Sequence, residues 1–287
     1  KDIDDFCNKA YAMNYNSARG MFEAYGRNKY SATGITTWKY DAAWPAATTW
    51  AYIDWYLRPT GAYFGAKKAC EPLHVQYAYD DDGIYVINSF YQPFSDLEVS
   101  AAVYNFDLTQ KLAKKATVNV PPDGKALAFK LVWPENLTKT FFVKLELRDQ
   151  TGTLRSQNLY WLSTTPDIPG PSGREFGAFI AKPKSSADFT LLNTLPRATL
   201  ETKSTHEPHG DEEWISATLT NPGPNLAFLV QLAVTKGPGG LEAGPSYWDE
   251  NYFSLLPGEA RTVKAIVPKA ELEGKEPTVR VLGWNVR

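Results

Sequence analysis

The chain has 287 residues, which is enough for two or three domains of ordinary size. Its 30 basic and 32 acidic residues leave a formal net charge of −2, so the composition argues against nucleic-acid binding or a basic membrane-attachment segment. No apolar run reaches the roughly 18 residues of a membrane-spanning helix. We therefore expect partners other than nucleic acid or a membrane.

The first quarter of the chain has a helical period that is interrupted by one strand-like run. Apolar residues recur at helical spacing in four segments, residues 2–13, 17–25, 48–57 and 63–69. An aspartate can cap the first of these helices, and Pro72 ends the last. Residues 34–38 are a short β-branched run that predicts a buried strand. The predicted order is therefore helix, helix, strand, helix, helix.

From residue 73 the hydrophobic period changes to two. The alternation predicts seven short strands, near residues 73–79, 84–86, 97–105, 116–120, 126–132, 141–147 and 154–162. Asp80-Asp81-Asp82-Gly83, between the first two strands, favours a hairpin turn, because the other ligands of a calcium-binding loop are missing. Seven short strands with turn signals between them indicate an immunoglobulin-like sandwich.

Residues 164–183 contain four prolines and three glycines, which favours a linker or an extended crossing. A second strand series follows, at residues 198–203, 213–220, 226–235, 260–267 and 278–284, and predicts a second sandwich. The sequence is thus divided into four parts: residues 1–71, the first sandwich at 72–165, the linker at 166–183 and the second sandwich at 184–287.

Metal and disulfide signals are weak. Two cysteines, Cys7 and Cys70, give no disulfide framework and are expected to be two buried thiols. His206 and His209 have metal-ligand spacing, but Pro208 prevents a regular helix and no third ligand is evident, so an exposed loop is favoured. We expect no cofactor and no metal site.

Charged residues on the first helical segments have an ordinary interpretation. Arg19, Glu23 and Arg27 lie four residues apart, which is the spacing of ion pairs on a helix surface.

Residues 34–45, Gly-Ile-Thr-Thr-Trp-Lys-Tyr-Asp-Ala-Ala-Trp-Pro, resemble the last barrel strand and following loop of family-two glycoside hydrolases of the β-mannosidase and exo-β-D-glucosaminidase branch. In that branch a Gly-hydrophobic-x-x-Trp strand runs into an Asn-x-x-Trp loop. Four further segments resemble later parts of exo-β-D-glucosaminidases or of this branch, in the same order: residues 61–77, 156–163, 249–259 and 279–285. Together these matches cover almost the whole chain.

The resemblance implies a parent enzyme with five domains: a jelly roll, a sandwich, a (β/α)8 TIM barrel and two further sandwiches. The implied fold of this chain is mixed, the terminal portion of a TIM barrel followed by two immunoglobulin-like β-sandwich domains. Residues 1–71 would supply the last helices and the eighth strand of the barrel.

The implied activity of the parent is retaining hydrolysis of β-1,4-linked glucosamine from the non-reducing end of chitosan oligosaccharides. A β-mannosidase or an endo-β-mannosidase of the same family is the nearest alternative. In a different class, the sandwiches could be a non-catalytic carbohydrate-binding module that uses exposed Trp133, Trp214 or Trp248. A coplanar exposed pair of these would support that alternative, and a purely structural role is the third possibility.

Retaining glycosidases need two carboxyl groups about 5–5.5 Å apart, one to protonate the leaving oxygen and one to attack the anomeric carbon. Of the acidic residues before Pro72, only Asp41 follows the expected barrel strand, and none matches the acid/base or nucleophile motif of the family. We therefore expect no catalytic residue in this chain and no glycosidase activity from it alone.

Three residues are candidates for contact with a sugar. Trp38 corresponds to the strand-eight tryptophan that forms the floor of the family's terminal sugar subsite, although a buried core position is the alternative. Asp41 stands where this branch usually has asparagine, and could bind a hydroxyl or a glucosamine ammonium or simply cap a loop. Trp44 could line the rim or pack in the core. Alternation does not decide whether Lys39 or Tyr40 faces inward.

One strand and four helices cannot close a barrel, so the apolar faces around Phe22, Trp38 and Trp50 would be open to water. Burying each such side chain is worth roughly 1.5–3 kcal/mol. We therefore hypothesise that the N-terminal catalytic portion of the same enzyme is a partner, as part of the same precursor or as a companion chain. The polymeric substrates of the family imply secretion or a periplasmic location.

Overall fold

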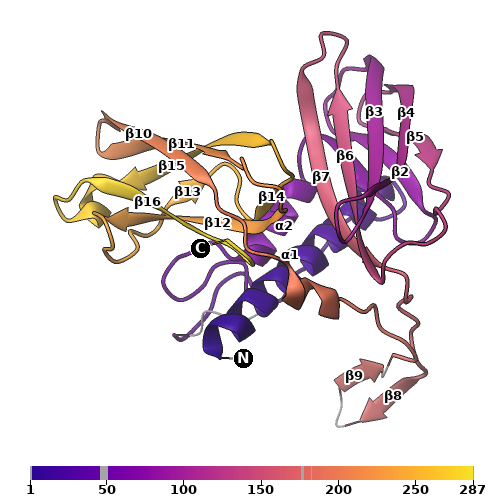
Figure 1. Ribbon diagram of the computed structural model, residues 1–287, viewed down its shortest axis with the longest axis horizontal. Coiled ribbons are helices and arrows are strands. Elements are labelled where there is room, and N and C mark those ends of the chain that lie inside the picture. Colours follow the sequence, from indigo (N-terminus) through magenta and orange to yellow (C-terminus); the bar gives the residue numbers. More distant parts are fainter. Residues whose placement is uncertain (1, 46–50, 176–177, 182, 287) are drawn as a thin grey trace. The chain divides into compact units, whose positions relative to one another are not determined.

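The computed structural model describes residues 2–45, 51–175, 178–181 and 183–286. The chain forms two compact units (Figure 1). The helix–sandwich unit consists of residues 1–71 and 196–287, and the central sandwich unit consists of residues 72–195. Each unit contains a β-sandwich. None of the helices that the structure describes is long and apolar enough to cross a membrane.

The central sandwich unit is built from two antiparallel sheets, one with the order β1-β2-β5 and one with the order β4-β3-β6-β7. Its strands are β1 (Leu73–Tyr77), β2 (Gly83–Asn88), β3 (Phe94–Asn105), β4 (Gln110–Val120), β5 (Lys125–Lys130), β6 (Thr140–Arg148) and β7 (Leu154–Ser163). The period of two predicted all seven. In β3, for example, Leu97, Val99 and Val103 are buried in the core between the sheets.

The segment predicted as a linker is more ordered than its prolines and glycines indicate. It contains a two-stranded antiparallel sheet, β8 (Ser172–Glu175) and β9 (Ala178–Ala181), and is followed by the 3-10 helix η1 (Thr190–Thr194). Asp188 begins η1 by accepting hydrogen bonds from the backbone N–H and the hydroxyl of Thr190, at 2.9 and 2.6 Å. Its carboxylate also pairs with Lys139 of the sandwich at 3.0 Å.

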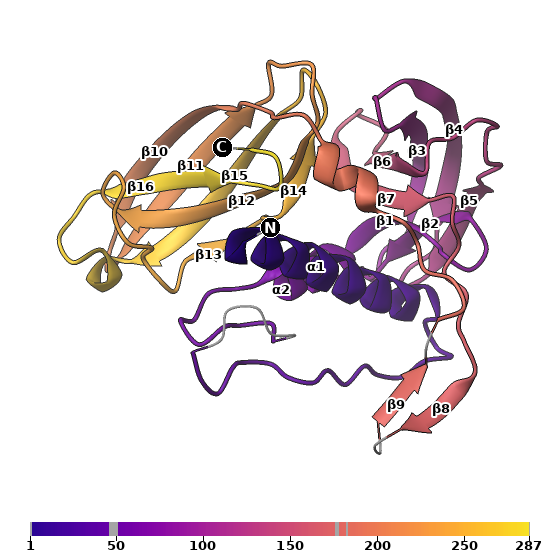
Figure 2. The same ribbon diagram turned by 60° about the horizontal axis from the view of Figure 1, so that its bottom comes forward.

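The helix–sandwich unit combines two helices with a second sandwich (Figure 2). The sheets have the orders β10-β11-β15-β13 and β14-β12-β16. The elements are α1 (Ile3–Arg27), α2 (Gly61–Ala69), β10 (Glu201–His209), β11 (Glu212–Thr220), β12 (Ala227–Lys236), β13 (Tyr247–Trp248), β14 (Phe253–Leu255), β15 (Ala260–Pro268), the 3-10 helix η2 (Lys269–Leu272) and β16 (Pro277–Leu282). The sequence missed β13 and β14, which have only two and three residues.

Small residues let α2 lie directly against α1. Gly61 and Gly65 are four residues apart and share one face of α2. A Cβ atom at either glycine would collide with the backbone of α1, at Tyr11 or at Tyr15. Tyr252 packs into the same junction, with its ring centroid 5.9 Å from that of Tyr11 and 5.8 Å from that of Phe64. These contacts join the two helices to the second sandwich.

Two predictions about α1 are wrong. The two expected helices are one continuous helix, which starts at the predicted aspartate cap because Asp2 accepts a hydrogen bond from Asp5 N–H at 3.0 Å. Arg19 and Glu23 do not lie on the helix surface, since each is only 1% exposed. The close approach of α2 at Gly65, next to Arg19 N, covers this side of α1.

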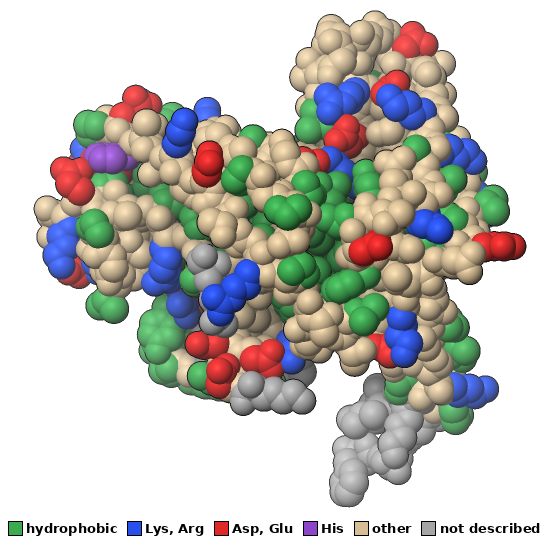
Figure 3. Space-filling model, in the orientation of Figure 1, with side chains coloured by type: hydrophobic (Ala, Val, Ile, Leu, Met, Phe, Trp, Pro, Cys, Tyr) green, Lys and Arg blue, Asp and Glu red, His purple; other side chains and the backbone are tan. Residues whose placement is uncertain are grey.

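The segment between the helices also departs from the predicted barrel elements. Residues 34–38 form no strand, and residues 51–57 form no helix; the other positions of that predicted helix, up to Trp50, lie outside the described residues. A strand needs a hydrogen-bonded neighbour, and the described residues place none beside 34–38. Hydrophobic side chains gather at the surface where Figure 1 draws this segment (Figure 3).

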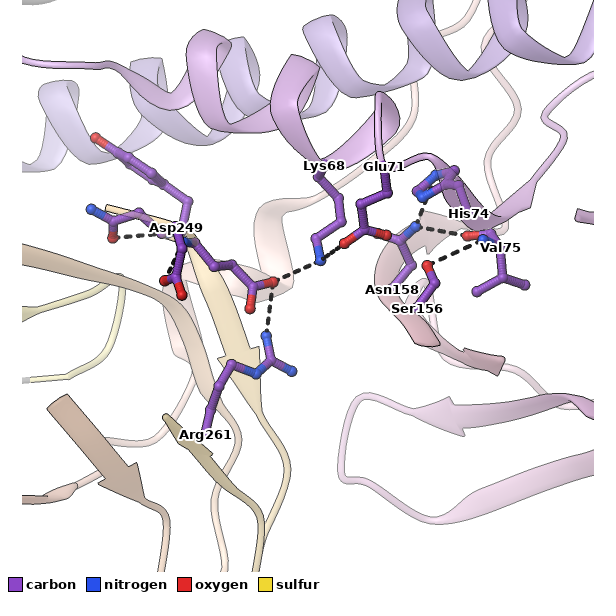
Figure 4. Close-up of polar contacts among 11 residues, drawn as sticks. Lys68, Glu71, His74, Val75, Ser156, Asn158, Asp249 and Arg261 are labelled. Atoms are coloured by element: carbon purple, nitrogen blue, oxygen red, sulfur yellow. Dashed lines mark hydrogen bonds and ion pairs between the residues drawn. The ribbon is translucent and has the colours of Figure 1, made fainter. Parts of the chain in front are cut away.

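A partly buried ion network ties the end of α2 to the second sandwich (Figure 4). The ammonium of Lys68 lies 2.7 Å from Glu71 and 2.8 Å from Glu250. Glu250 in turn contacts the Arg261 guanidinium at 3.2 Å. Burial opposes ionisation of Glu250, but the two cations overcome it and hold the pKa of this carboxyl below its usual value. The same carboxylates raise the pKa of Lys68 against the effect of its burial.

Candidate functional site

The three candidate sugar-contacting residues lie together on one exposed loop of the helix–sandwich unit. Trp38 is 77% exposed and Trp44 is 58% exposed, and Asp41 between them is also exposed. The loop offers two indole rings and one carboxylate to solvent.

Backbone hydrogen bonds hold this loop in place. The carbonyl of Tyr40 accepts from the N–H groups of both Tyr52 and Ile53, each at 2.9 Å. The N–H of Ala42 donates to the Ile53 carbonyl at 3.1 Å. The candidate loop is therefore fixed against residues 52–53, although the sequence indicates no strand pairing there.

Lys39 and Tyr40 have different environments. The alternation of side chains along a strand did not decide which of the two faces inward. The Lys39 ammonium lies 5.1 Å from the centre of the Trp44 ring, which is the geometry of a cation–π contact. Lys39 is half-buried, whereas Tyr40 is 67% exposed. One face of Trp44 is thus partly covered, and Trp38 offers the more open ring.

A second structured turn, which sequence reasoning missed, adjoins the candidate loop. It is the hairpin of residues 51–60, closed by the hydrogen bond from Thr60 N–H to the Tyr52 carbonyl at 2.9 Å. Its organising residue is Asp54, which is 2% exposed. One carboxylate oxygen accepts from the N–H groups of Tyr56 and Arg58 at 2.9 Å, and the other binds the Arg58 guanidinium at 2.7 and 2.8 Å. The Asp-x-x-x-Arg spacing was the available signal.

The side chains of residues 28–60 offer groups that can bind a ligand. Residues 28–60 contain two carboxylates, Asp41 and Asp54, and the hydrogen bonds of Asp54 assign it to the hairpin. That leaves Asp41 as the carboxylate able to meet a ligand. A sugar can place the C–H face of its ring against an exposed indole, and a single carboxylate can accept from a hydroxyl or an ammonium group.

The histidine pair lies in a strand. His206 and His209 belong to β10, so the predicted loop is wrong, although both residues are exposed. The His206 ring contacts Glu213 at 3.2 Å and Glu276 at 3.1 Å. Among the described residues, no group of three or more His, Cys, Asp or Glu side chains is arranged to hold a metal ion.

The cysteines also differ from the expectation of buried thiols. Both are free, Cys7 is partly exposed and Cys70 is exposed.

The three tryptophans proposed for a carbohydrate-binding module form no exposed pair. Trp248 is 3% exposed. Trp133 is half-buried and packs edge-on against Phe141, with ring centroids 5.2 Å apart. Trp214 is 40% exposed, but one face stacks on His209 at 4.4 Å. The feature that would support this alternative is therefore missing at these three residues.

Two family descriptions match the sandwich regions. Residues 178–286 match the "Exo-beta-D-glucosaminidase Ig-fold domain". Residues 83–165 match the "Mannosidase Ig/CBM-like domain".

Similar curated proteins extend the match to nearly the whole chain. The exo-beta-D-glucosaminidase of Streptomyces avermitilis is 37% identical over 99% of this chain and 32% of its own length. The enzyme of the same name from Amycolatopsis orientalis is 32% identical over 99% of this chain and 28% of its own length. A mannosylglycoprotein endo-beta-mannosidase of Lilium longiflorum is 25% identical over 99% of this chain and 34% of its length. The chain thus spans about a third of the length of the curated relatives it matches.

Solved structures agree with this likeness. The crystal structure of the Amycolatopsis orientalis exo-chitosanase CsxA has a TM-score of 0.92 and 32% identity, covering 99% of this chain and 34% of that one. A β-D-mannosidase from Dictyoglomus thermophilum has a TM-score of 0.62 at 17% identity, covering 95% of this chain and 29% of that one, which is a likeness of fold.

Proposed function

The chain carries the Ig-fold domains of the exo-β-D-glucosaminidase and mannosidase family of glycoside hydrolases, and we propose that it is the C-terminal part of a retaining exo-β-D-glucosaminidase. The substrate of the whole enzyme would be chitosan oligosaccharides, from which it removes glucosamine at the non-reducing end. The observation that carries this proposal is the 99% coverage of the chain by exo-β-D-glucosaminidases at 37% and 32% identity.

In this proposal, residues 1–71 are the last portion of a TIM barrel, and the catalytic carboxylates belong to the other part of the enzyme. Helix α1 supports this proposal, because it buries polar side chains and exposes apolar ones. Its polar residues Arg19 and Glu23 are buried against this chain, whereas an apolar stripe on the opposite side is open to water. The stripe consists of Ile3, Phe6, Met13 and Met21, which are 70%, 57%, 63% and 42% exposed.

A helix that exposes such a stripe needs a partner to cover it. The N-terminal catalytic portion of the same enzyme, as part of one chain or as a companion chain, is the partner we propose. In a barrel, each strand also receives hydrogen bonds from both neighbours, so the same partner would supply the pairing that residues 34–38 lack here.

Trp38, Asp41 and Trp44 would then contact the terminal sugar. The loop that follows a barrel strand lies at the catalytic face of such enzymes. Trp38 would stack on the pyranose ring, Asp41 would attract the ammonium of glucosamine, and Trp44 would line the rim. Because the substrates are polymers, we also propose that the whole enzyme is secreted or periplasmic.

The test is an activity assay on the complete protein to which this chain belongs. We expect release of glucosamine from chitosan oligosaccharides and from p-nitrophenyl β-D-glucosaminide, with the β-anomer as the first product by NMR. This chain expressed by itself should release neither. Release of mannose from β-mannosides, without release of glucosamine, would instead identify the complete protein as a member of the mannosidase branch. Binding of glycans without hydrolysis by the complete protein would favour a carbohydrate-binding module.

A further inference from the structure

The hairpin of residues 51–60 displays apolar side chains on an unusually well-anchored turn. Its tip consists of Trp55, Tyr56 and Leu57, which are 48%, 55% and 55% exposed. Leu57 adopts a left-handed backbone conformation, with φ of 59°, which is costly for a residue other than glycine. The hydrogen bonds of Asp54 to the backbone on both sides of Leu57 hold the chain in this conformation.

The base of the hairpin is fixed to the second sandwich by charge. Arg58 lies 3.7 Å from Glu242, and Glu242 contacts Arg280 of β16 at 2.9 Å. Gly244 lies against the hairpin, where a Cβ atom would be 3.4 Å from the carbonyl oxygen of Tyr56. The tip is therefore presented by a rigid support, which is a common arrangement for binding loops.

The tip and the candidate loop form one continuous surface segment. Tyr40, two residues after Trp38, is hydrogen-bonded to Ile53, two residues before Trp55. The reach of the backbone then limits the Cα atoms of Trp38 and Trp55 to a separation of at most about 20 Å. A short oligosaccharide can span such a distance.

Trp55 is the ring at the tip that is open for stacking. One face of Tyr56 is occupied by the Arg58 guanidinium, whose central carbon lies 5.1 Å from the ring centre. The nearby charges are already balanced, since the carboxylates of Asp54 and Glu242 are matched by the guanidinium groups of Arg58 and Arg280. A ligand at this tip would therefore be recognised mainly by its apolar ring face, with a cation–π contribution from any ammonium group it carries.

We propose that the tip of the 51–60 hairpin is a second sugar-binding element, at which Trp55 stacks on a residue of the oligosaccharide beyond the terminal sugar. This inference rests on the proposed function, because it assumes that the loop of Trp38 holds the terminal sugar. It adds a determinant of substrate length: the hairpin contacts long substrates and leaves short ones untouched.

The experiment compares three variants of the complete protein, Trp55→Ala, Trp55→Phe and the control Trp214→Ala. Trp214 is a similarly exposed tryptophan on the sandwich strand β11. The first readout is affinity for a glucosamine oligosaccharide by isothermal titration calorimetry, with a catalytic carboxylate of the N-terminal portion replaced in every variant so that the ligand is not hydrolysed. We expect Trp55→Ala to weaken binding on the order of tenfold, Trp55→Phe to restore most of it, and Trp214→Ala to have no effect.

The second readout is the ratio of kcat/KM on long and short substrates. Trp55→Ala should lower kcat/KM on the oligosaccharide and change it less than about twofold on p-nitrophenyl β-D-glucosaminide. Unchanged oligosaccharide affinity in Trp55→Ala, or a loss that Trp55→Phe does not repair, would overturn the inference. If the complete protein binds through Trp55 but hydrolyses neither substrate, the inference stands and the proposed enzymatic function fails.

Discussion

The buried amide side chain of Asn285 stabilises one end of the second sandwich. Asn285, which is 8% exposed, accepts a hydrogen bond from Phe228 N–H at 2.9 Å. Its amide nitrogen donates to the carbonyls of Pro196 and Leu226, each at 2.7 Å. One side chain thus satisfies three backbone groups, and the segments around Pro196 and 226–228 are tied to the end of the chain.

Replacing Asn285 with alanine should destabilise the helix–sandwich unit by about 3 kcal/mol, because buried backbone groups would lose their partners. The measurement is urea unfolding followed by tryptophan fluorescence, where the midpoint should fall at constant slope. Asn225→Ala is the matched control, since Asn225 makes a single exposed hydrogen bond to the Arg197 carbonyl. If both variants unfold at the same urea concentration, the bridging role of Asn285 is refuted.

The burial and the contacts of single side chains were the hardest features to predict from the sequence. Arg19 and Glu23 have the spacing of surface ion pairs, and nothing local indicates that two glycines of α2 bring that helix over them. Asp54 lies within a stretch predicted as a helix, and its hydrogen bonds back to Tyr56 and Arg58 stabilise a turn instead. Trp38 was expected at the end of a buried strand but lies on one exposed loop with Asp41 and Trp44, and the contact of these residues with a sugar stays a prediction.

Among the elements, strands with a period of two were predicted well, because each strand's neighbours lie within this chain. All seven strands of the central sandwich unit are present, and the five predicted in the second sandwich correspond to β10, β11, β12, β15 and β16. The failure at residues 34–38 has the opposite cause. A barrel strand is stabilised by neighbours on both sides, and sequence pattern alone does not reveal that the described chain supplies none.

The ion network at the end of α2 predicts a pH dependence of stability. Glu250 has a pKa held below its unfolded value of 4.5 by Lys68 and Arg261 against its burial, so its contribution is present above that value and is lost as the pH falls through the folded pKa. Lys68 has a raised pKa, so its contribution is present below 10.5 and is lost as the pH rises beyond that value. The network should stabilise the unit across the whole neutral range.

The variant Glu250→Gln tests this element. At pH 7 it should lose about 2–3 kcal/mol of unfolding free energy, because the partly buried cations of Lys68 and Arg261 would lose a carboxylate partner. The difference from the unchanged protein should shrink as the pH is lowered below about 4.5. Glu98→Gln is the control, since its partner Lys115 is 66% exposed, and should cost less than about 0.5 kcal/mol. If the loss of unfolding free energy in Glu250→Gln stays constant down to pH 3, the stabilisation by Glu250 is not electrostatic.

For the whole molecule, the exposed stripe of α1 is the feature that demands a partner. Phe6 and Met13, which are 57% and 63% exposed, lie on the side of the helix opposite the buried Arg19. Burying two such side chains against a catalytic portion would contribute roughly 3–6 kcal/mol to association. The double substitution Phe6→Ser, Met13→Ser should therefore weaken association without unfolding α1, because both positions face away from α2.

The measurement is co-purification of a tagged N-terminal portion of the enzyme with this chain when the two are expressed together. The double variant should be recovered at less than about a tenth of the normal yield relative to the tagged partner. Leu241→Ser is the control, because Leu241 is 80% exposed on the same unit but far along the chain from α1. Equal recovery of the double variant and the control would show that α1 is not the contact. Recovery restored by Phe6→Leu, Met13→Leu would identify apolar burial as the force that joins the two portions.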